Sequence, residues 1–297
     1  MIISEQWPDL LEAGLKKIFI NQYDDIPTMT NDIFSKMDST KSQEKFSSAG
    51  VFPSISAFTG KVDYSSEPVQ GYDKTVSFTE YAGGFTVERK LAADDLYNIV
   101  SSFPENFAIA IKRFRETMGA DVFNRAFTYT PTDGDAQPLC SNSHPSTADA
   151  SYAGDNLGTT ALSATAVSTA RLAMRKYTDD QNGKIYVMGD TILAPIDLEE
   201  TAWEIINSRG KVDTANNNAN FLMGKYKLLV WPFLSDTNNW FMMDSSYMKK
   251  WLHWIDREPV QFFKDKDSDT LVAKYAAYFR MATAWIDWRF IYGSNVS

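Results

Sequence analysis

Four residues in one short stretch have side chains suited to nucleophilic chemistry: Cys140, Ser141, Ser143 and His144. A thiol or hydroxyl nucleophile needs a base beside it and a third group that orients this base. The stretch, Pro138-Leu-Cys-Ser-Asn-Ser-His-Pro145, lies in a loop without a strand-to-helix turn that would present a nucleophile. We therefore expect no catalytic residue, and a hydrolase that uses Cys140 or Ser141 with His144 is the least favoured alternative.

The ligand sets of common metal and phosphate sites are incomplete. Two histidines and one cysteine do not fill a structural zinc site at the usual spacings. The segment Asp265-Lys-Asp-Ser-Asp269 begins like a calcium loop, but Thr270 replaces the required glycine and Ala276 replaces the glutamate. No glycine-rich phosphate-binding motif occurs in the sequence. We expect no metal and no cofactor, and we interpret 264–269 as a solvated hairpin turn.

Charge and composition narrow the classes of partner. The chain has 297 residues with a net charge of −9, so its surface repels nucleic-acid phosphates on average. A single cysteine excludes an internal disulfide, which fits folding in a reducing cytoplasm. No apolar run reaches the about 20 residues that a membrane helix needs, and the start does not resemble a signal peptide. We expect no membrane partner.

The secondary-structure elements that would position the residues above include several predicted helices. Apolar spacing predicts a short amphipathic helix around Leu10–Ile18, a short helix over 91–100, and helices over 161–177 and 198–208. A long helix is expected over 104–127, with Pro104 in its first turn. Its apolar face is formed by Phe107, Ile111, Phe114, Met118 and Val122, and the opposite face carries Lys112, Arg113, Arg115 and Glu116.

Strands are predicted in the second half of the chain, at 185–188, 192–196, 226–234 and 240–243. A closing hairpin pairs 260–263 with the long run 271–292. The predicted class is therefore α+β, with a middle α/β unit inserted between the long helix and the closing strands. We find no internal repeat in the sequence.

Residues 55–89 predict an unusual feature, a two-stranded ribbon with little around it to bury both faces. Apolar and polar residues alternate along 62–64, 76–78 and 85–87, which is the period of strands. A two-stranded ribbon is marginally stable in water, so we expect this one to lie on another molecule. The candidate contact residues near its middle and tip are Lys61, Tyr64, Glu67, Tyr72, Asp73 and Lys74.

The order of these segments resembles that of a known family, and several sequence strings strengthen the resemblance. The strings are Gly50-Val-Phe-Pro53 after Phe46, Phe58-Thr-Gly-Lys61, Gly71-Tyr72, Asp94-Asp95-Leu96, Asp133-Gly134, Pro138–Pro145, Ile192–Glu200, Gly224–Val230 and Trp240–Asp244. In order and spacing they resemble the major capsid proteins of tailed phages, which have the Hong Kong 97-like fold, and in particular the Mu-like major head protein branch.

The resemblance implies a function and a division of the chain. Many copies would form the pentamers and hexamers of an icosahedral shell around double-stranded DNA. Residues 1–50 would be an N-terminal arm and 51–92 an extended hairpin called the E-loop. The peripheral P-domain would comprise 93–160 and 245–297, with 104–127 as its spine helix. The axial A-domain would be 161–244, with the polar loop 213–220 near the capsomer axis.

The resemblance also implies partners and a location. The chain would bind itself, a separate scaffold protein and a portal protein, and would contact packaged DNA only non-specifically. It would be assembled in the host cytoplasm, reside in the virion shell, and keep its N-terminus uncleaved. Some members crosslink a lysine of the E-loop, for which Lys61 and Lys74 are candidates by location, but we expect a non-covalent shell. The alternative from the same setting is another virion component, such as a tail or decoration protein.

Overall fold

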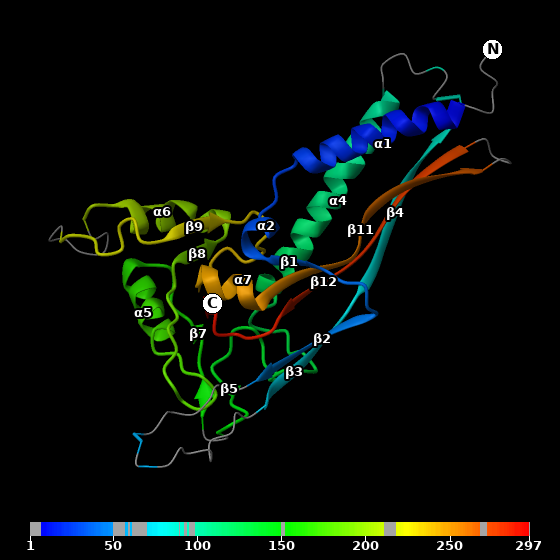
Figure 1. Ribbon diagram of the computed structural model, residues 1–297. Coiled ribbons are helices and arrows are strands. Elements are labelled where there is room, and N and C mark those ends of the chain that lie inside the picture. Colours follow the sequence, from blue (N-terminus) through cyan, green and yellow to red (C-terminus); the bar gives the residue numbers. More distant parts are fainter. Residues whose placement is uncertain are drawn as a thin grey trace.

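A long helix crosses the molecule and joins two sheets (Figure 1). The computed structural model describes residues 7–49, 57–58, 60, 70–88, 90–91, 94, 99–149, 152–210, 218–267 and 272–296. The expected positions Lys61, Tyr64 and Glu67, most of the expected helix 91–100, and residues 213–217 of the polar loop lie outside the described residues.

The helices are α1 (Trp7–Asp25), α2 (Thr30–Ile33), α4 (Ile99–Asn124), α5 (Ala164–Met174), the 3-10 helix η1 (Ile196–Leu198), α6 (Glu199–Asn207) and α7 (Ser245–Trp251). The strands are β1 (Ser35–Asp38), β2 (Gln43–Ala49), β3 (Gln70–Ser77), β4 (Thr79–Glu88), β5 (His144–Pro145), β6 (Ala153–Gly154), β7 (Leu157–Gly158), β8 (Thr191–Ala194), β9 (Lys227–Val230), β10 (Trp240–Met243), β11 (Leu252–Asp267), β12 (Val272–Trp285) and β13 (Ile291–Ser294).

The first sheet has the strand order β1-β11-β12-β4 and packs one face against α4. Strands β11 and β12 form the closing hairpin, which is longer than predicted and runs from the pair Leu252↔Trp285 to the pair Asp267↔Val272. Alternate residues of β12 are buried, because one face of the strand meets the helix while the other faces outward. The buried positions include Ala273, Tyr275, Ala277, Phe279 and Met281.

The second sheet, ordered β7-β13-β10-β8-β9, separates two cores. All four residues of β10 are buried. Phe241 and Met243 belong to the core shared with α4, whereas Trp240 and Met242 belong to the core beneath α5 and α6. Such burial on both faces explains why this strand is a continuous apolar run in the sequence.

The ribbon differs from the prediction. Strand β3 pairs antiparallel with β2 from the N-terminal arm, and β4 pairs with β12, so 75–88 is not one strand of an isolated hairpin. The apolar residues of these strands find partners within the chain: Val76 packs with Ile255 and Ala284, and Val87 joins the core at α4. Strand β2 includes 43–45 of the polar run 38–45 and was not predicted, because main-chain pairing at an exposed edge needs no apolar side chain.

The long helix is confirmed, but it begins at Ile99, so Pro104 lies inside it. Arg115 and Glu116, which were predicted on the face opposite the apolar one, are both buried. Arg115 Nη2 donates to both carboxylate oxygens of Asp256 on β11, at 3.1 and 2.9 Å. The charged Arg115 side chain can be buried because its charge is paired with that of Asp256.

Three further predictions needed correction. Residues 185–188 form no strand, and only an isolated bridge joins Thr178 to Lys184. Residues 264–267 continue β11 instead of forming a turn. The run expected to continue to Tyr292 breaks after Trp285, and β13 leaves the hairpin to join the second sheet beside β10. Helix α7 was not predicted; it begins where the Asp244 carboxylate accepts hydrogen bonds from the backbone nitrogens of Ser246 and Tyr247.

Candidate functional site at the base of the ribbon

The candidate nucleophiles are not brought together with a base. Cys140 is buried, and burial raises the pKa of its thiol far above the ordinary value. The Ser141 hydroxyl donates to Gln137 Oε1 at 3.3 Å rather than to His144. The geometry of these three residues is therefore not that of a nucleophile and its general base.

His144 instead holds the loop 128–160 in place. Only 2% of the residue is exposed; its Nδ1 lies 2.6 Å from Asp135 Oδ2 and its Nε2 lies 3.0 Å from Asn156 Oδ1. The Asn156 amide nitrogen donates to the backbone oxygens of Leu139 and Ile291, which fixes which end of the amide faces His144. The imidazole also stacks on Trp288 at 4.4 Å with an interplanar angle of 12°.

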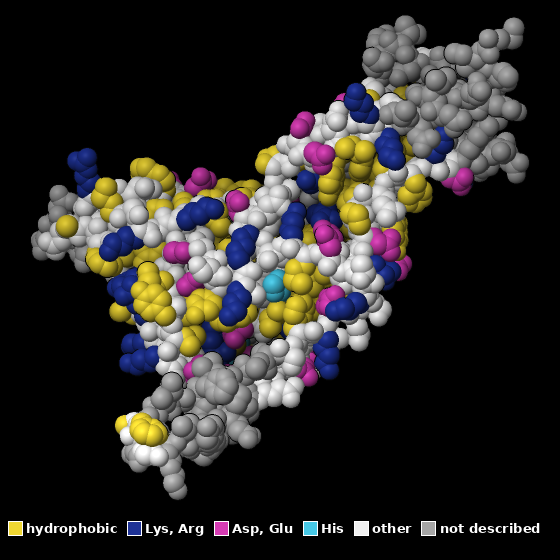
Figure 2. Space-filling model, viewed as in Figure 1, with side chains coloured by type: hydrophobic (Ala, Val, Ile, Leu, Met, Phe, Trp, Pro, Cys, Tyr) yellow, Lys and Arg dark blue, Asp and Glu magenta, His cyan; other side chains and the backbone are white. Residues whose placement is uncertain are grey.

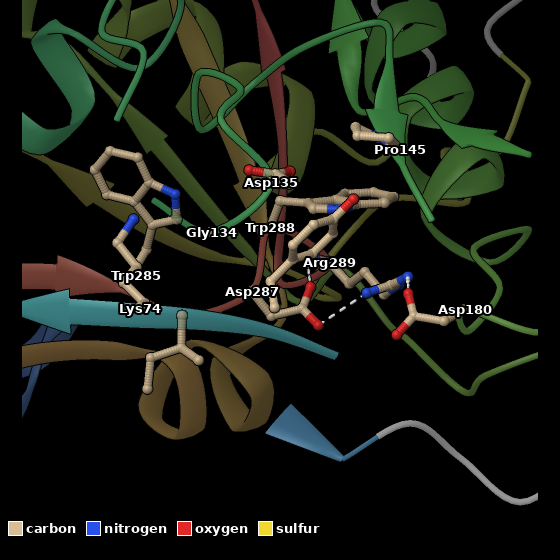
Figure 3. Close-up of a pocket in the computed structure, with 11 residues that line it drawn as sticks. Lys74, Gly134, Asp135, Pro145, Asp180, Trp285, Asp287, Trp288 and Arg289 are labelled. Atoms are coloured by element: carbon tan, nitrogen blue, oxygen red, sulfur yellow. Dashed lines mark hydrogen bonds and ion pairs between the residues drawn. The ribbon is translucent and has the colours of Figure 1, made fainter. Parts of the chain in front are cut away.

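We now call the pair of strands β2 and β3 the ribbon, and the part of β3 at residues 72–75 its base. A pocket lies beside His144, where this base meets the body of the subunit (Figure 3). It is formed by four segments: β3, the chain from the end of α4 to β5, the chain that follows α5, and the end of β12 with the residues after it. The lining residues are Tyr72, Lys74, Gly134, Asp135, Pro145, Asp180, Trp285, Ile286, Asp287, Trp288 and Arg289. We call this group the ribbon cradle.

Lys74 is the central side chain of the ribbon cradle on the strand side. Its ammonium lies 4.1 Å from the centre of the Trp285 ring, and only 9% of the residue is exposed. Burial lowers the pKa of Lys74, and the carboxylates of Asp133 and Asp135 oppose this shift. Trp285 therefore provides a cation–π contact within the same chain.

Backbone hydrogen bonds fasten the same strand to the loop. The Thr75 nitrogen donates to Asp133 Oδ2 at 2.6 Å, and the Gly134 nitrogen donates to the Asp73 carbonyl oxygen at 3.0 Å. Gly134 has φ +73°, a conformation that glycine adopts without the steric cost of a side chain. The base of the ribbon is thus anchored to its own subunit.

Arg289 neutralises the opposite side of the ribbon cradle. Its guanidinium donates to Asp180 at 2.7 Å, to Asp287 at 2.9 Å and to the Thr178 carbonyl oxygen at 2.8 Å. Burial alone would lower the pKa of Arg289, but the carboxylates of Asp287 and Asp180 outweigh it and raise the pKa. Figure 3 shows these ion pairs as dashed lines.

Three of the six predicted contact residues can be located. Tyr72 and Lys74 line the ribbon cradle, while Asp73 lies 3.6 Å from Lys45 Nζ on the neighbouring strand β2. Sequence reasoning missed Asp135, Trp285 and Arg289. The clustered run Trp285-Ile-Asp-Trp-Arg289 was the available signal, since aromatic and charged residues gather at structured surface sites.

The described part of the chain contains neither a cluster of metal ligands nor a membrane-spanning helix. No cluster of three or more His, Cys, Asp or Glu residues suited to a metal ion occurs among the described residues. Among the helices within those residues, none is both long enough and apolar enough to cross a membrane.

The fold matches solved capsid structures at low sequence identity. The capsid of cyanophage P-SCSP1u gives a TM-score of 0.61 at 10% identity, covering 91% of this chain and 88% of that chain. The capsid of a native GTA particle gives 0.58 at 14% identity, with coverages of 89% and 88%. The procapsid of bacteriophage JBD30 gives 0.55 at 13% identity, with coverages of 98% and 76%. These likenesses confirm the expected α+β, Hong Kong 97-like capsid fold.

Sequence comparison identifies the family. Residues 71–294 match the family model described as phage capsid protein. No curated protein matches the sequence significantly. Because the family match spans both sheets and the long helix between them, the chain belongs to the phage capsid protein family.

Proposed function

We propose that this chain is the major capsid protein of a tailed phage and that it assembles into the pentamers and hexamers of an icosahedral shell around double-stranded DNA. The observation that carries the proposal is the family match over residues 71–294. The capsid fold supports it independently, because the matched structures come from assembled shells. The Mu-like branch is our finer proposal, based on the sequence strings.

We also propose a division of the chain into four parts. We assign residues 1–50 to the arm, 51–92 to the E-loop, 93–160 and 245–297 to the P-domain, and 161–244 to the A-domain. The long helix α4 with the first sheet supports the P-domain assignment. The separate core beneath α5 and α6 supports the A-domain assignment.

The ribbon is the proposed strap between neighbouring copies. In Figure 1, β2 and β3 extend away from the first sheet. The ribbon cradle supports this role. Because the base of the ribbon is hydrogen-bonded to its own subunit, a neighbour that binds the ribbon is also held to the body of that subunit. The proposed contact residues are Tyr72, Asp73 and Lys74 at the base, together with Lys61, Tyr64 and Glu67, which lie outside the described residues. The placement of Lys74 over Trp285 supports a non-covalent shell.

Further partners follow from the same assignment. A separate scaffold protein and a portal protein would guide assembly, and DNA would be enclosed without specific contacts. The net charge of −9 supports the last point, since an acidic surface does not hold phosphates strongly. Assembly would take place in the host cytoplasm and the product would be the virion shell.

Electron microscopy of the full chain, expressed alone and together with the scaffold protein of the same phage, tests the proposal. We expect closed shells or capsomers; soluble monomers under both conditions would contradict it. A second test deletes residues 61–69, which leaves β3 and its contacts with the ribbon cradle in place. The deleted subunit should fold, as judged by circular dichroism, but should fail to close shells. Normal particles from this deletion would exclude the ribbon as a strap.

A further inference from the structure

Helix α6 carries an exposed acidic and aromatic surface. The helix buries Ala202, Ile205 and Ile206 against the core of its unit. On the outward side Glu200 and Glu204 are exposed, one turn apart, and beside them Trp203 is 59% exposed. Neither carboxylate forms an ion pair with any described residue. We call Glu200, Trp203 and Glu204 the acidic face.

The same unit carries a basic and aromatic surface on α5 and on the segment before β9. The Arg171 guanidinium and the Lys225 ammonium both lie over the ring of Phe221, at 4.9 and 3.1 Å from its centre. Arg175 is exposed one helical turn after Arg171. Figure 2 shows Lys and Arg side chains gathered over this part of the molecule.

We call Arg171, Arg175, Phe221 and Lys225 the basic face. Like charges one turn apart on a helix destabilise it slightly, and no carboxylate among the described residues forms an ion pair with either arginine. The ring of Phe221 is also 53% exposed, so its outer side is open to a partner. Opposite charges and aromatic rings therefore lie on different elements of one folded unit, without ion pairs among the described residues.

We infer that the acidic face of one copy docks on the basic face of the next copy around a ring. This inference rests on the proposed function and assigns the residues of one of its contacts. A contact that paired either face with itself would place like charges together, whereas a contact between the acidic face of one copy and the basic face of the next pairs opposite charges. Head-to-tail contacts close into rings when the rotation between copies permits it.

The overall charge explains why such a contact is needed. Copies with a net charge of −9 repel one another on average, so association requires a local region of opposite sign. The basic face provides this region, and it binds Glu200 and Glu204 of the neighbouring copy. Trp203 packs against the cations and the ring of Phe221, where an aromatic side chain adds contact area and a cation–π interaction.

Charge reversal in both directions tests the inference. One variant carries Glu200→Lys with Glu204→Lys, a second carries Arg171→Glu with Arg175→Glu, and a third combines all four substitutions. The two reversals cancel, so the combined variant keeps the net charge of the natural chain and serves as the matched control. Sedimentation velocity measures capsomer formation, electron microscopy measures shells, and circular dichroism monitors folding.

Each double variant should remain folded and should need an at least about tenfold higher concentration to form capsomers. The combined variant should recover assembly, and a mixture of the two double variants should form rings of even number only. Normal assembly of either double variant, or failure of both the combined variant and the mixture, would overturn the inference.

Three further outcomes separate a failure of this inference from a failure of the proposed function. If shells of the Arg171→Glu, Arg175→Glu variant form normally but retain less DNA, the basic face contacts nucleic acid and the inference is wrong. If the natural chain forms shells while the combined variant and the mixture do not, the proposed function stands and only the inference fails. If the natural chain forms neither capsomers nor shells, the proposed function itself fails.

Discussion

The indole nitrogen of Trp231 donates a hydrogen bond of 2.9 Å to the carboxylate of Glu116, across 115 positions of sequence. The same carboxylate accepts hydrogen bonds from the backbone nitrogens of Met29 and Thr30, at 3.2 and 3.3 Å, and from the Thr30 hydroxyl at 2.9 Å. One buried side chain on α4 therefore joins the N-terminal arm, the long helix and the chain after β9. These contacts connect regions that we assign to three parts of a capsid subunit.

Removal of this carboxylate should destabilise the whole subunit. Glu116→Ala would leave the Trp231 and Thr30 donors buried without partners, and we expect the free energy of unfolding to fall by about 2–4 kcal/mol. Glu116→Gln should cost less, because its amide oxygen still accepts. Urea denaturation followed by tryptophan fluorescence measures both. Glu105→Gln, exposed on the same helix, is the control; a loss for Glu116→Ala no larger than the control would contradict this role.

The buried pair between Arg115 and Asp256 should behave differently from a surface ion pair. Arg115→Met removes the cation from beside the Asp256 carboxylate, whose side chain is only 15% exposed, and we expect a loss of about 3 kcal/mol. Arg113→Met, at the exposed neighbouring position, should change stability by less than about 0.5 kcal/mol. Equal effects of the two substitutions in denaturant titrations would show that the pair contributes no more than a surface charge.

Stability should fall in mild acid because of His253. Burial lowers the pKa of this histidine below its ordinary 6.5, although backbone hydrogen bonds to Lys250 and Ser35 oppose the shift. As the pH falls through 6.5, the unfolded chain therefore binds more protons than the folded one and stability decreases; well above pH 6.5 the group has no effect.

Substitution of this histidine provides the measurement. His253 stacks on Phe46 of β2 at 5.5 Å, and His253→Phe keeps an aromatic ring there but removes the titration. Between about pH 7.5 and 5.5, we expect the natural chain to lose up to about 1 kcal/mol more than the variant. Denaturant unfolding at both pH values decides this, and parallel losses in the two proteins would rule out His253 as the source.

Gly154 should not tolerate a side chain. A Cβ at this position would collide with the ring of Trp288, the residue on which His144 stacks. Gly154→Ala should therefore cost about 1–3 kcal/mol through displacement of that ring. Gly14→Ala, in the helix α1 with open space around it, should be neutral or stabilising. Thermal unfolding compares the two, and similar melting temperatures would contradict the predicted collision.

Lys74 should react slowly with amine-directed reagents in the folded subunit. Its ammonium is covered by Trp285, whereas Lys16 on α1 is exposed. Mass spectrometry after brief labelling should find several-fold less modification at Lys74, because the reagent needs an opening of the ribbon base. Trp285→Ala should remove the difference. Labelling of both lysines at the same rate in the natural chain would show that the ribbon cradle is open in solution.

Some features of the molecule follow from local sequence patterns. The apolar spacing along 107–122 predicts α4, the alternation along 272–281 belongs to β12, and the continuous apolar run at 240–243 becomes β10. These patterns succeed because each reports which faces of a single element are buried. The order of such elements, with the sequence strings, was also enough to indicate the capsid fold.

Strand partners and buried charges depended on the tertiary structure. Nothing in 70–88 indicates that β3 pairs with Gln43–Ala49 while β4 pairs with β12. Strand pairing uses main-chain groups that every residue has, so the side chains of one strand do not identify its partner strand. In the sequence Arg115 and Glu116 look like ordinary surface charges. Only the folded structure brings Asp256 next to Arg115 and Trp231 next to Glu116. The sequence by itself determined the long helix and the strands with a clear apolar pattern, because such a pattern reports the burial of a single element. The tertiary structure alone decided which distant segments pair and which charges are buried, because both depend on neighbours that are far away in the sequence.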